Sequence, residues 1–316
     1  MRFVEVTVNG PKTWSLAAAL DPGIAAAYDA AQDRAAVEIV AWLAEHATTR
    51  VGPRGRQVQV PVEEIEAAVV RHYTSRAGDP HRHLHLQINS RVWAQGRWRG
   101  LHTVGVRDSL EAINGIGHAA VMCDPGFRTA LAVHGLTLDA ESGEIRELAG
   151  FVGAFSARAR QIEQHVDSYE AAWRAEHPGQ EPGPRLRQGW DRRAWATARP
   201  DKVVPTDGAE LTARWVEELA ELGYHPPRAV APGGAVRPGE LDREVLVEVA
   251  LSRLGARRSA WNRADIRGEV ERLLARAGWS PRVVSVASWP RTWPRGWWQP
   301  PAGCWTARTR PSMSGR

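Results

Sequence analysis

Cysteine is scarce in this sequence, with only Cys123 and Cys304 among 316 residues. Two cysteines are too few for the disulfide framework of a small secreted protein, and low cysteine content suits the reducing cytoplasm. Long apolar runs and the layout of a signal peptide are also missing, which argues against membrane insertion. The phosphate-binding motif G-x-x-x-x-G-K-[ST] does not occur, so the sequence does not support ATP hydrolysis. We therefore expect a cytoplasmic protein.

Acidic residues are missing from the C-terminal segment 279–316, which contains six arginines. The rest of the chain has 35 of the 41 basic residues and all 36 acidic ones, so its net charge is about −1. The net charge of +5 therefore comes from this segment. The global charge therefore says little about nucleic-acid binding by the remaining chain. The segment also contains tryptophans without helical or strand period, namely Trp279, Trp289, Trp293, Trp297, Trp298 and Trp305. It is either a basic aromatic arm that stacks on single-stranded bases or, as we favour, a tail translated out of frame.

Histidine, in contrast, is concentrated in a short stretch. His83 and His85 lie two apart in an alternating run, so both side chains are expected on the same face of a strand. His72 belongs to a second strand-like run, and the short connection 75–80 can turn that run back beside the first. Three imidazoles on one sheet face would form a three-nitrogen site for a divalent metal ion with open positions.

The remaining pattern predicts both strands and helices. Alternating or β-branched runs predict strands at residues 2–8, 56–62, 67–74 and 80–89, followed by a hairpin turn at 93–98. Apolar residues at helical spacing predict helices at 24–46, 106–134 (with a break at 124–126), 155–176, 208–222, 241–254 and 263–277. We expect an α+β fold, in which helices cover an antiparallel sheet of about five strands and a small helical segment follows.

The histidine stretch closely resembles a known metal motif. The order and spacing of His72, Thr74–Arg76, Asp79–Pro80, His83-x-His85 and Asn89 resemble the HUH motif of conjugative relaxases of the TrwC/TraI (MobF) type. Residues 5–15 are similar to the strand–turn segment of that family, and residues 155–162 are similar to a helix start further along its sequence. The resemblance covers roughly residues 1–230.

The resemblance also implies a domain organisation. Residues 1–226 would form the relaxase domain, and residues 227–239 would form a linker. Residues 240–278 resemble the helical module that precedes a P-loop helicase in the family, and residues 279–316 would be a disordered or frameshifted tail.

The chemistry that the resemblance implies is transesterification of a DNA phosphodiester. A divalent ion (Mg²⁺, Mn²⁺ or similar), held by His72, His83 and His85, would polarise the scissile phosphate while a tyrosine attacks it. In the family this tyrosine precedes the segment that residues 5–15 resemble. The tyrosines of this sequence all follow that segment, at Tyr28, Tyr73, Tyr169 and Tyr224. We therefore expect an N-terminally truncated relaxase fragment that lacks its nucleophile and is deficient in nicking.

Other residues near these motifs are candidates for the site. Glu5 aligns with an acidic residue that, in the family, lies beside the metal-bound histidines, where it can fix an imidazole tautomer. His81 is not expected to be a ligand, although it could contact a phosphate. Basic residues near the motifs could bind DNA phosphates, with Trp93 and Trp98 as stacking platforms: Lys12, Arg76, Arg97, Arg99, Arg158 and Arg160. For Arg97 and Arg99, a solvated hairpin with a tryptophan packed in the core is an equal alternative.

Three functions agree with these features. The first is a relaxase fragment that binds and nicks single-stranded or hairpin DNA at a conjugative transfer origin, with other relaxosome and type IV secretion proteins as partners. The second is a catalytically silent, metal-dependent module that binds single-stranded DNA. The third is a metal-dependent hydrolase that uses water as its nucleophile.

Overall fold

The computed structural model describes residues 2–197, 208–229, 242–278 and 304–308. The strands are β1 (Phe3–Asn9), β2 (Thr48–Val51), β3 (Val58–Pro61), β4 (Glu64–Thr74), β5 (Pro80–Asn89), β6 (Arg91–Ala94), β7 (Arg97–Gly100) and β8 (Cys304–Arg308). The helices are α1 (Lys12–Leu20), α2 (Pro22–His46), α3 (Thr103–Asp108), α4 (Leu110–Met122), α5 (Pro125–Val133), the 3₁₀ helix η1 (Arg146–Phe151), α6 (Ala157–Glu176), α7 (Pro184–Thr197), α8 (Gly208–Glu221), α9 (Arg243–Arg257) and α10 (Arg263–Arg276). None of these described helices is long and apolar enough to cross a membrane.

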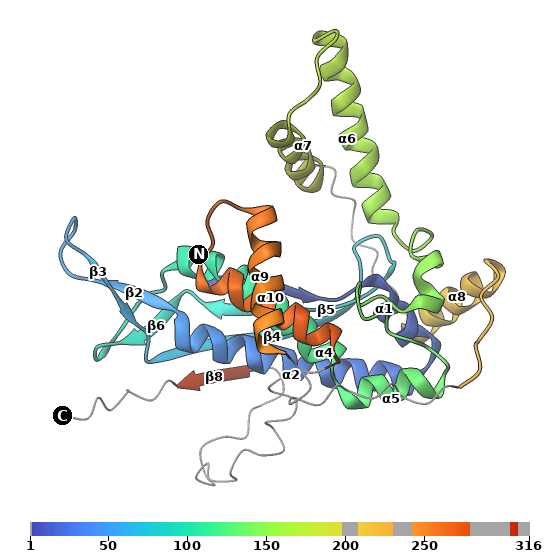
Figure 1. The fold of residues 1–316 in the computed structure, drawn as a ribbon, viewed down its shortest axis with the longest axis horizontal. Helices are drawn as coiled ribbons and strands as arrows, with labels where there is room; N and C mark the ends of the chain where they lie inside the picture. The colour runs from blue at the N-terminus through green and yellow to red at the C-terminus, as the bar shows by residue number, and fades with distance from the viewer. Residues whose placement is uncertain (1, 198–207, 230–241, 279–303, 309–316) are drawn as a thin grey trace.

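The central sheet is antiparallel, in the order β1–β5–β4–β6–β7. Strand β5 therefore lies between β1 and β4, the strand that carries His72. Strands β2 and β3 form a separate two-stranded sheet that projects from one end of the molecule (Figure 1). The expected α+β fold with a sheet of about five strands is confirmed.

A short strand from the C-terminal segment also joins this sheet. Strand β8 pairs antiparallel with β4 along residues 64–68. The remainder of the tail, 279–303 and 309–316, lies outside the described residues, as does most of the expected linker 227–239. The domain boundaries and the reading frame of the tail stay predictions.

One face of the sheet packs against α2 and α4. Leu84, Leu86 and Ile88 of β5 are fully buried on this face, in a cluster that includes Ile39 of α2 and Ile116 of α4. A second cluster surrounds Trp14, Tyr28 and Phe127 and joins α1 and α2 to α5, η1 and α8. Because burial of apolar area drives this packing, the other sheet face is left for polar side chains.

Helices α6 and α7 form an arm that extends away from the sheet (Figure 1). The start of α6 lies next to the sheet, and no residue of α6 is fully buried. The arm therefore contributes little to the hydrophobic core, and only its base can complete a site on the sheet.

The C-terminal helices are joined to the body through α10, which packs on α4 and α9. The backbones of α10 and α4 approach so closely that a Cβ atom added to Gly268 of α10 would lie 2.2 Å from the carbonyl oxygen of Glu111 in α4. Beside this contact, the buried carboxylate of Glu269 pairs with Arg253, Arg257 and Arg272. The pairs with Arg253 and Arg257 hold α10 to α9. The close glycine contact, together with the ion pair of Arg272 with Glu111 at 3.2 Å, indicates a specific interface between α10 and α4.

Candidate metal centre

The histidines reach one face of the sheet through strand alternation and register. On β5, Leu84 and Leu86 point into the core, so His83 and His85 point to the opposite face. Across the β4–β5 pair, His72 lies directly opposite His83. Directly paired residues of neighbouring strands share a face, and this brings the third imidazole to the same place.

The three rings converge closely. Their centroids are 5.3 Å apart for His72 and His83, 4.6 Å for His72 and His85, and 5.0 Å for His83 and His85. One nitrogen from each ring lies within 4.8 Å of the other two. The common face expected from the sequence is therefore present.

The donor atoms of this cluster suit a metal ion. His83 donates through Nδ1 to the carbonyl oxygen of His81 at 2.8 Å, so its Nε2 keeps a lone pair. That Nε2 lies 3.2 Å from Nε2 of His85, and two facing imidazole nitrogens are stable only around a shared proton or a cation. Burial lowers the pKa of His83, which favours the neutral form that ligation requires. The residues therefore fit a divalent ion.

Glu5 lies beside this cluster. Its Oε1 is 3.0 Å from Nδ1 of His85, a distance for an ion pair, although the two groups are not aligned as a hydrogen bond. A small rotation of either side chain would align them and direct the His85 Nε2 lone pair toward the other histidines. Glu5 is thus placed to orient His85 and is not one of the three residues whose donor atoms converge.

His81 is near the cluster without belonging to it. Its ring is 4.6 Å from that of His83 and lines the same cleft. Burial, reinforced by the charges of His83 and Lys12, lowers the pKa of His81 to about 3. A neutral imidazole at this place can accept or donate a hydrogen bond, and His81 is not among the residues whose ring nitrogens converge as a possible metal site.

A cleft of about 630 Å³ lies over the histidines. Its floor is the polar sheet face, and the base of the arm adds the N-cap residue Ser156 and Arg158 at the start of α6 and Trp195 from α7. Lys12 and Arg76 complete the basic part of the lining. Lys12 donates to the carbonyl oxygen of Pro80 at 3.0 Å, and burial lowers its pKa.

The remaining basic candidates lie elsewhere. Arg160 donates to the backbone carbonyls of Gly153 and Ala154 and does not line the cleft. Arg97 and Arg99 lie on β7, at the end of the sheet where β2 and β3 project, and Arg99 donates to the carbonyl oxygen of Ala94 at 2.9 Å. Of the six candidates, three therefore line the cleft, two lie on β7 and Arg160 belongs to neither surface.

Sequence reasoning missed Trp195 and the arginines of the β2–β3 hairpin. Trp195 belongs to no recognisable sequence motif, and only the folding of the arm brings it to the cleft. Arg54 and Arg56, at the tip of the hairpin, are exposed in a Gly–Pro turn. A basic turn between two alternating runs was the available signal for this second surface.

None of the four tyrosines, all within the described residues, lines the cleft. Tyr28 is fully buried in the second core cluster, and burial raises its pKa. Tyr73 follows His72 directly and therefore points to the opposite face of β4, where the guanidinium of Arg82 lies 4.6 Å from its ring centre. Tyr169 is on the arm beneath Arg193, and Tyr224 is buried against Phe151.

Comparison with known proteins agrees with this geometry. Residues 1–222 match the model of the TrwC relaxase family. No curated protein matches the chain.

Solved structures with the same fold include three complexes of the conjugative relaxase TrwC. The metal-free complex with oriT DNA is 23% identical and has a TM-score of 0.51, covering 70% of this chain and 72% of that chain. The metal-bound complex with oriT DNA is 21% identical with a TM-score of 0.53, covering 71% and 73%. A complex with a 27-mer DNA comprising the recognition hairpin and the cleavage site is 21% identical with a TM-score of 0.52, covering 71% and 75%.

At these identities the solved structures establish only the fold, whereas the match to the family model establishes the family to which the chain belongs. That model extends over 222 of 316 residues, and the three histidines of its region converge as a metal site requires. The chain belongs to the TrwC relaxase family, the MobF type of conjugative relaxase.

Proposed function

We propose that this chain binds single-stranded or hairpin DNA of a conjugative transfer origin at a metal centre formed by His72, His83 and His85. The observation that carries the proposal is the convergence of three imidazole nitrogens within 4.8 Å, on the floor of a cleft with basic walls. The TrwC structures with this fold are complexes with oriT DNA, and one of them is metal-bound. Relaxosome and type IV secretion proteins, in the cytoplasm, are the further partners that we propose.

Each residue of the cleft has a role in this proposal. His72, His83 and His85 would hold the ion, which supplies positive charge that polarises a phosphodiester oxygen. Glu5 would orient His85. Three cations around the ion would bind the neighbouring phosphates of the strand: Lys12, Arg76 and Arg158.

A second surface would contact the DNA backbone outside the cleft. The exposed Arg54 and Arg56 of the β2–β3 hairpin and Arg97 of β7 lie at the same end of the sheet. The two hairpins are joined there, because the hydroxyl of Thr49 donates to the carbonyl oxygen of Gly100 at 2.7 Å. Arginines on two linked β-hairpins can contact successive phosphates of a DNA duplex. We therefore propose that this surface binds the double-stranded stem of a DNA hairpin.

The position of the tyrosines favours binding without nicking. Transesterification by a tyrosine needs a phenolic hydroxyl in the cleft, and none of the four tyrosines supplies one. We therefore propose that the chain by itself binds DNA in a metal-dependent manner and does not cleave it. This observation also favours the second candidate function, a catalytically silent module that binds single-stranded DNA.

The test measures binding and cleavage separately. The protein is mixed with Mn²⁺ and a labelled DNA hairpin that carries a single-stranded extension, and anisotropy and denaturing gels are recorded on the same samples. The variant His83→Ala/His85→Ala removes two ligands. The matched control His165→Ala/His225→Ala removes two imidazoles outside the cleft.

The expected result is Mn²⁺-dependent binding without cleavage, lost in the ligand variant and kept in the control. Cleavage that requires the ligand histidines would overturn the proposed absence of a nucleophile and indicate attack by water or by another side chain. Binding that is unaffected by both Mn²⁺ and the ligand variant would refute the metal-centred function.

A further inference from the structure

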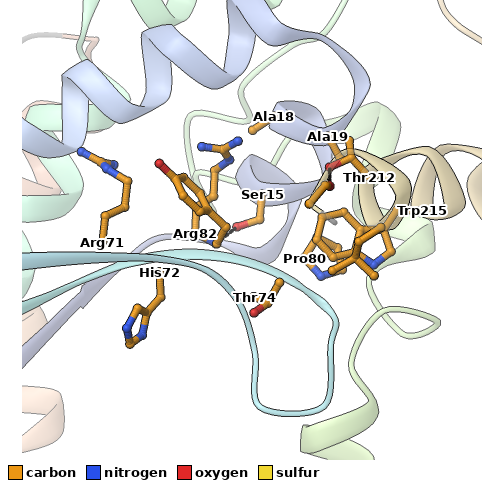
Figure 2. A pocket seen from close by; sticks show the side chains of 13 residues that line it. Ser15, Ala18, Ala19, Arg71, His72, Thr74, Pro80, Arg82, Thr212 and Trp215 are labelled. Atoms are coloured by element: carbon orange, nitrogen blue, oxygen red, sulfur yellow. Dashed lines mark hydrogen bonds between the residues drawn. The ribbon is translucent and has the colours of Figure 1, made fainter. Parts of the chain in front are cut away.

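A second cavity, of about 380 Å³, lies on the other side of β4, between the end of the β4–β5 pair and helices α1 and α8. Figure 2 shows that Arg71 and Arg82 lie on the helix side of the strand, whereas His72 and Thr74 point to the opposite side. His72 and Thr74 nevertheless contribute atoms to both cavities. The second cavity and the histidine cleft therefore meet at the end of β4.

The two arginines of this cavity differ in their hydrogen bonding. Arg71 is held by Asp29 at 3.0 Å and by Gln32 at 2.7 Å, and it also pairs with Asp33. Arg82 donates once within the described residues, from NH1 to Asp29 at 2.8 Å. Since a guanidinium has five N–H donors, Arg82 keeps its Nε and NH2 groups for a ligand, whereas Arg71 serves the structure.

The charges of the cavity are balanced. Asp29 and Asp33 offset the two guanidinium groups, so the site does not favour a phosphate over a neutral ligand. The rest of the wall combines apolar groups, such as Ala19 from α1 and the buried indole of Trp215 from α8, with hydroxyl-bearing side chains: Ser15, Tyr73, Thr74 and Thr212. The Trp215 ring is fixed by a hydrogen bond from Nε1 to the carbonyl oxygen of Gly78 at 3.2 Å.

A flat, neutral ligand with hydrogen-bond acceptors on one edge fits these features. A purine base stacks on an aromatic face, and a guanine presents O6 and N7, which a guanidinium fork contacts as a pair. The volume lies in the usual range for ligand sites, about 300–1,000 Å³. The rim shared with the histidine cleft allows a strand that lies in the cleft to turn one base into the cavity.

We propose that this cavity binds one unstacked guanine of the DNA strand held at the metal centre, read by Arg82. The inference rests on the proposed DNA-binding function and adds a base preference to it. The cavity and the metal site would then select two parts of the same strand, a base on one face of β4 and a phosphate on the other.

The experiment compares single-stranded oligonucleotides by anisotropy in the presence of Mn²⁺. A labelled oligo-dT is the reference, and a single dG, dA or dC is placed at each position in turn. Arg82→Lys keeps the charge beside Asp29 and removes the fork, and Thr212→Phe fills the cavity from the surface of α8. The control Val216→Phe adds the same ring to a residue of α8 that does not line the cavity.

One position of dG should raise the affinity by about fivefold or more over dT, as expected for a bidentate contact. Arg82→Lys and Thr212→Phe should each remove this preference while the affinity for oligo-dT stays the same, and Val216→Phe should keep the preference. Equal affinity for all bases, or a preference unchanged in both cavity variants, would overturn the inference while metal-dependent binding of oligo-dT still supports the proposed function.

A separate measurement tests the guanine site in case the proposed DNA-binding function fails. If no oligonucleotide binds, millimolar dGMP is added to the protein without metal and followed by chemical shifts of the tryptophan indole N–H groups. Saturable shifts that are absent with dTMP and absent in Thr212→Phe would support the guanine site alone. No shift with dGMP would overturn it.

Discussion

Replacement of Gly268 by alanine should destabilise the protein, although the same change usually stabilises a helix. Gly268 lies inside α10, where alanine normally contributes about 0.5–1 kcal/mol relative to glycine. Here the added Cβ would lie 2.2 Å from the carbonyl oxygen of Glu111 and 2.6 Å from its carbonyl carbon. These are backbone atoms of α4 that cannot rotate away, so α10 must shift by about 1 Å to restore an ordinary contact.

The magnitude follows from the two opposing contributions. Overpacking of a fixed interface costs about 1–3 kcal/mol, which exceeds the gain in helix propensity. The net loss should be about 1–2 kcal/mol, because Gly115 of α4 faces the same contact and offers no side chain that could yield. For a chain of this size that corresponds to a decrease in Tm of about 1.5–3 °C.

The assay is thermal unfolding followed by circular dichroism at a fixed Mn²⁺ concentration. The matched control is Gly255→Ala in α9, where an added Cβ meets nothing within 4 Å. That control should raise the free energy of unfolding by up to about 1 kcal/mol. If Gly268→Ala were as stabilising as Gly255→Ala, the close packing of α10 on α4 would be refuted.

Three further predictions concern the site and its surroundings. Glu5→Gln should lower Mn²⁺ affinity by about 10–100-fold in calorimetric titration, because the charge that orients His85 is lost, and unchanged affinity would contradict that role. Replacement of both Arg54 and Arg56 by Gln should reduce the slope of log K against log salt for a DNA hairpin by about 1.8, and an unchanged slope would show that this turn does not meet phosphates. Burial and nearby arginines lower the pKa of His118, so the unfolded state takes up its proton first and stability should fall as the pH decreases below about 6.5. His118→Gln should flatten that decrease in urea unfolding between pH 7 and 5, and an equal decrease would assign the pH dependence to other groups.

The metal ligands could be predicted from sequence because their placement depends on local rules. Alternation along β5 fixes His83 and His85, and a short turn returns β4 beside it, so only one long-range pairing was needed to place His72. The break between α4 and α5 was predicted for the same reason, since Pro125 begins the second helix with Asp124 as its N-cap. Helix α1 was missed, because its residues after Pro11 were interpreted as part of a strand–turn segment.

The basic part of the site was predicted less well, for two physical reasons. Arg158 and Arg160 are two residues apart on a helix, where such neighbours point in different directions, so only Arg158 reaches the cleft. Arg97 and Arg99 are close to the histidines in sequence, but β6 and β7 lead away from them along the sheet. Trp195 depends on the return of the arm over some 40 residues, which no local pattern encodes.

The alternation of β4 gives a physical reason for the proposed separation of metal binding from strand cleavage. The ligand His72 and the phenol of Tyr73 are adjacent in sequence, and a strand sends adjacent side chains to opposite faces. A slip of one residue would bring Tyr73 to the cleft, but it would also move the buried residues of β4 out of the core. The three ligands, in contrast, are positioned within one strand pair whose register the core already determines. The metal site can therefore form completely without a tyrosine, and a tyrosine hydroxyl for transesterification would have to enter the cleft from above the sheet, where Ser156, Arg158 and Trp195 lie.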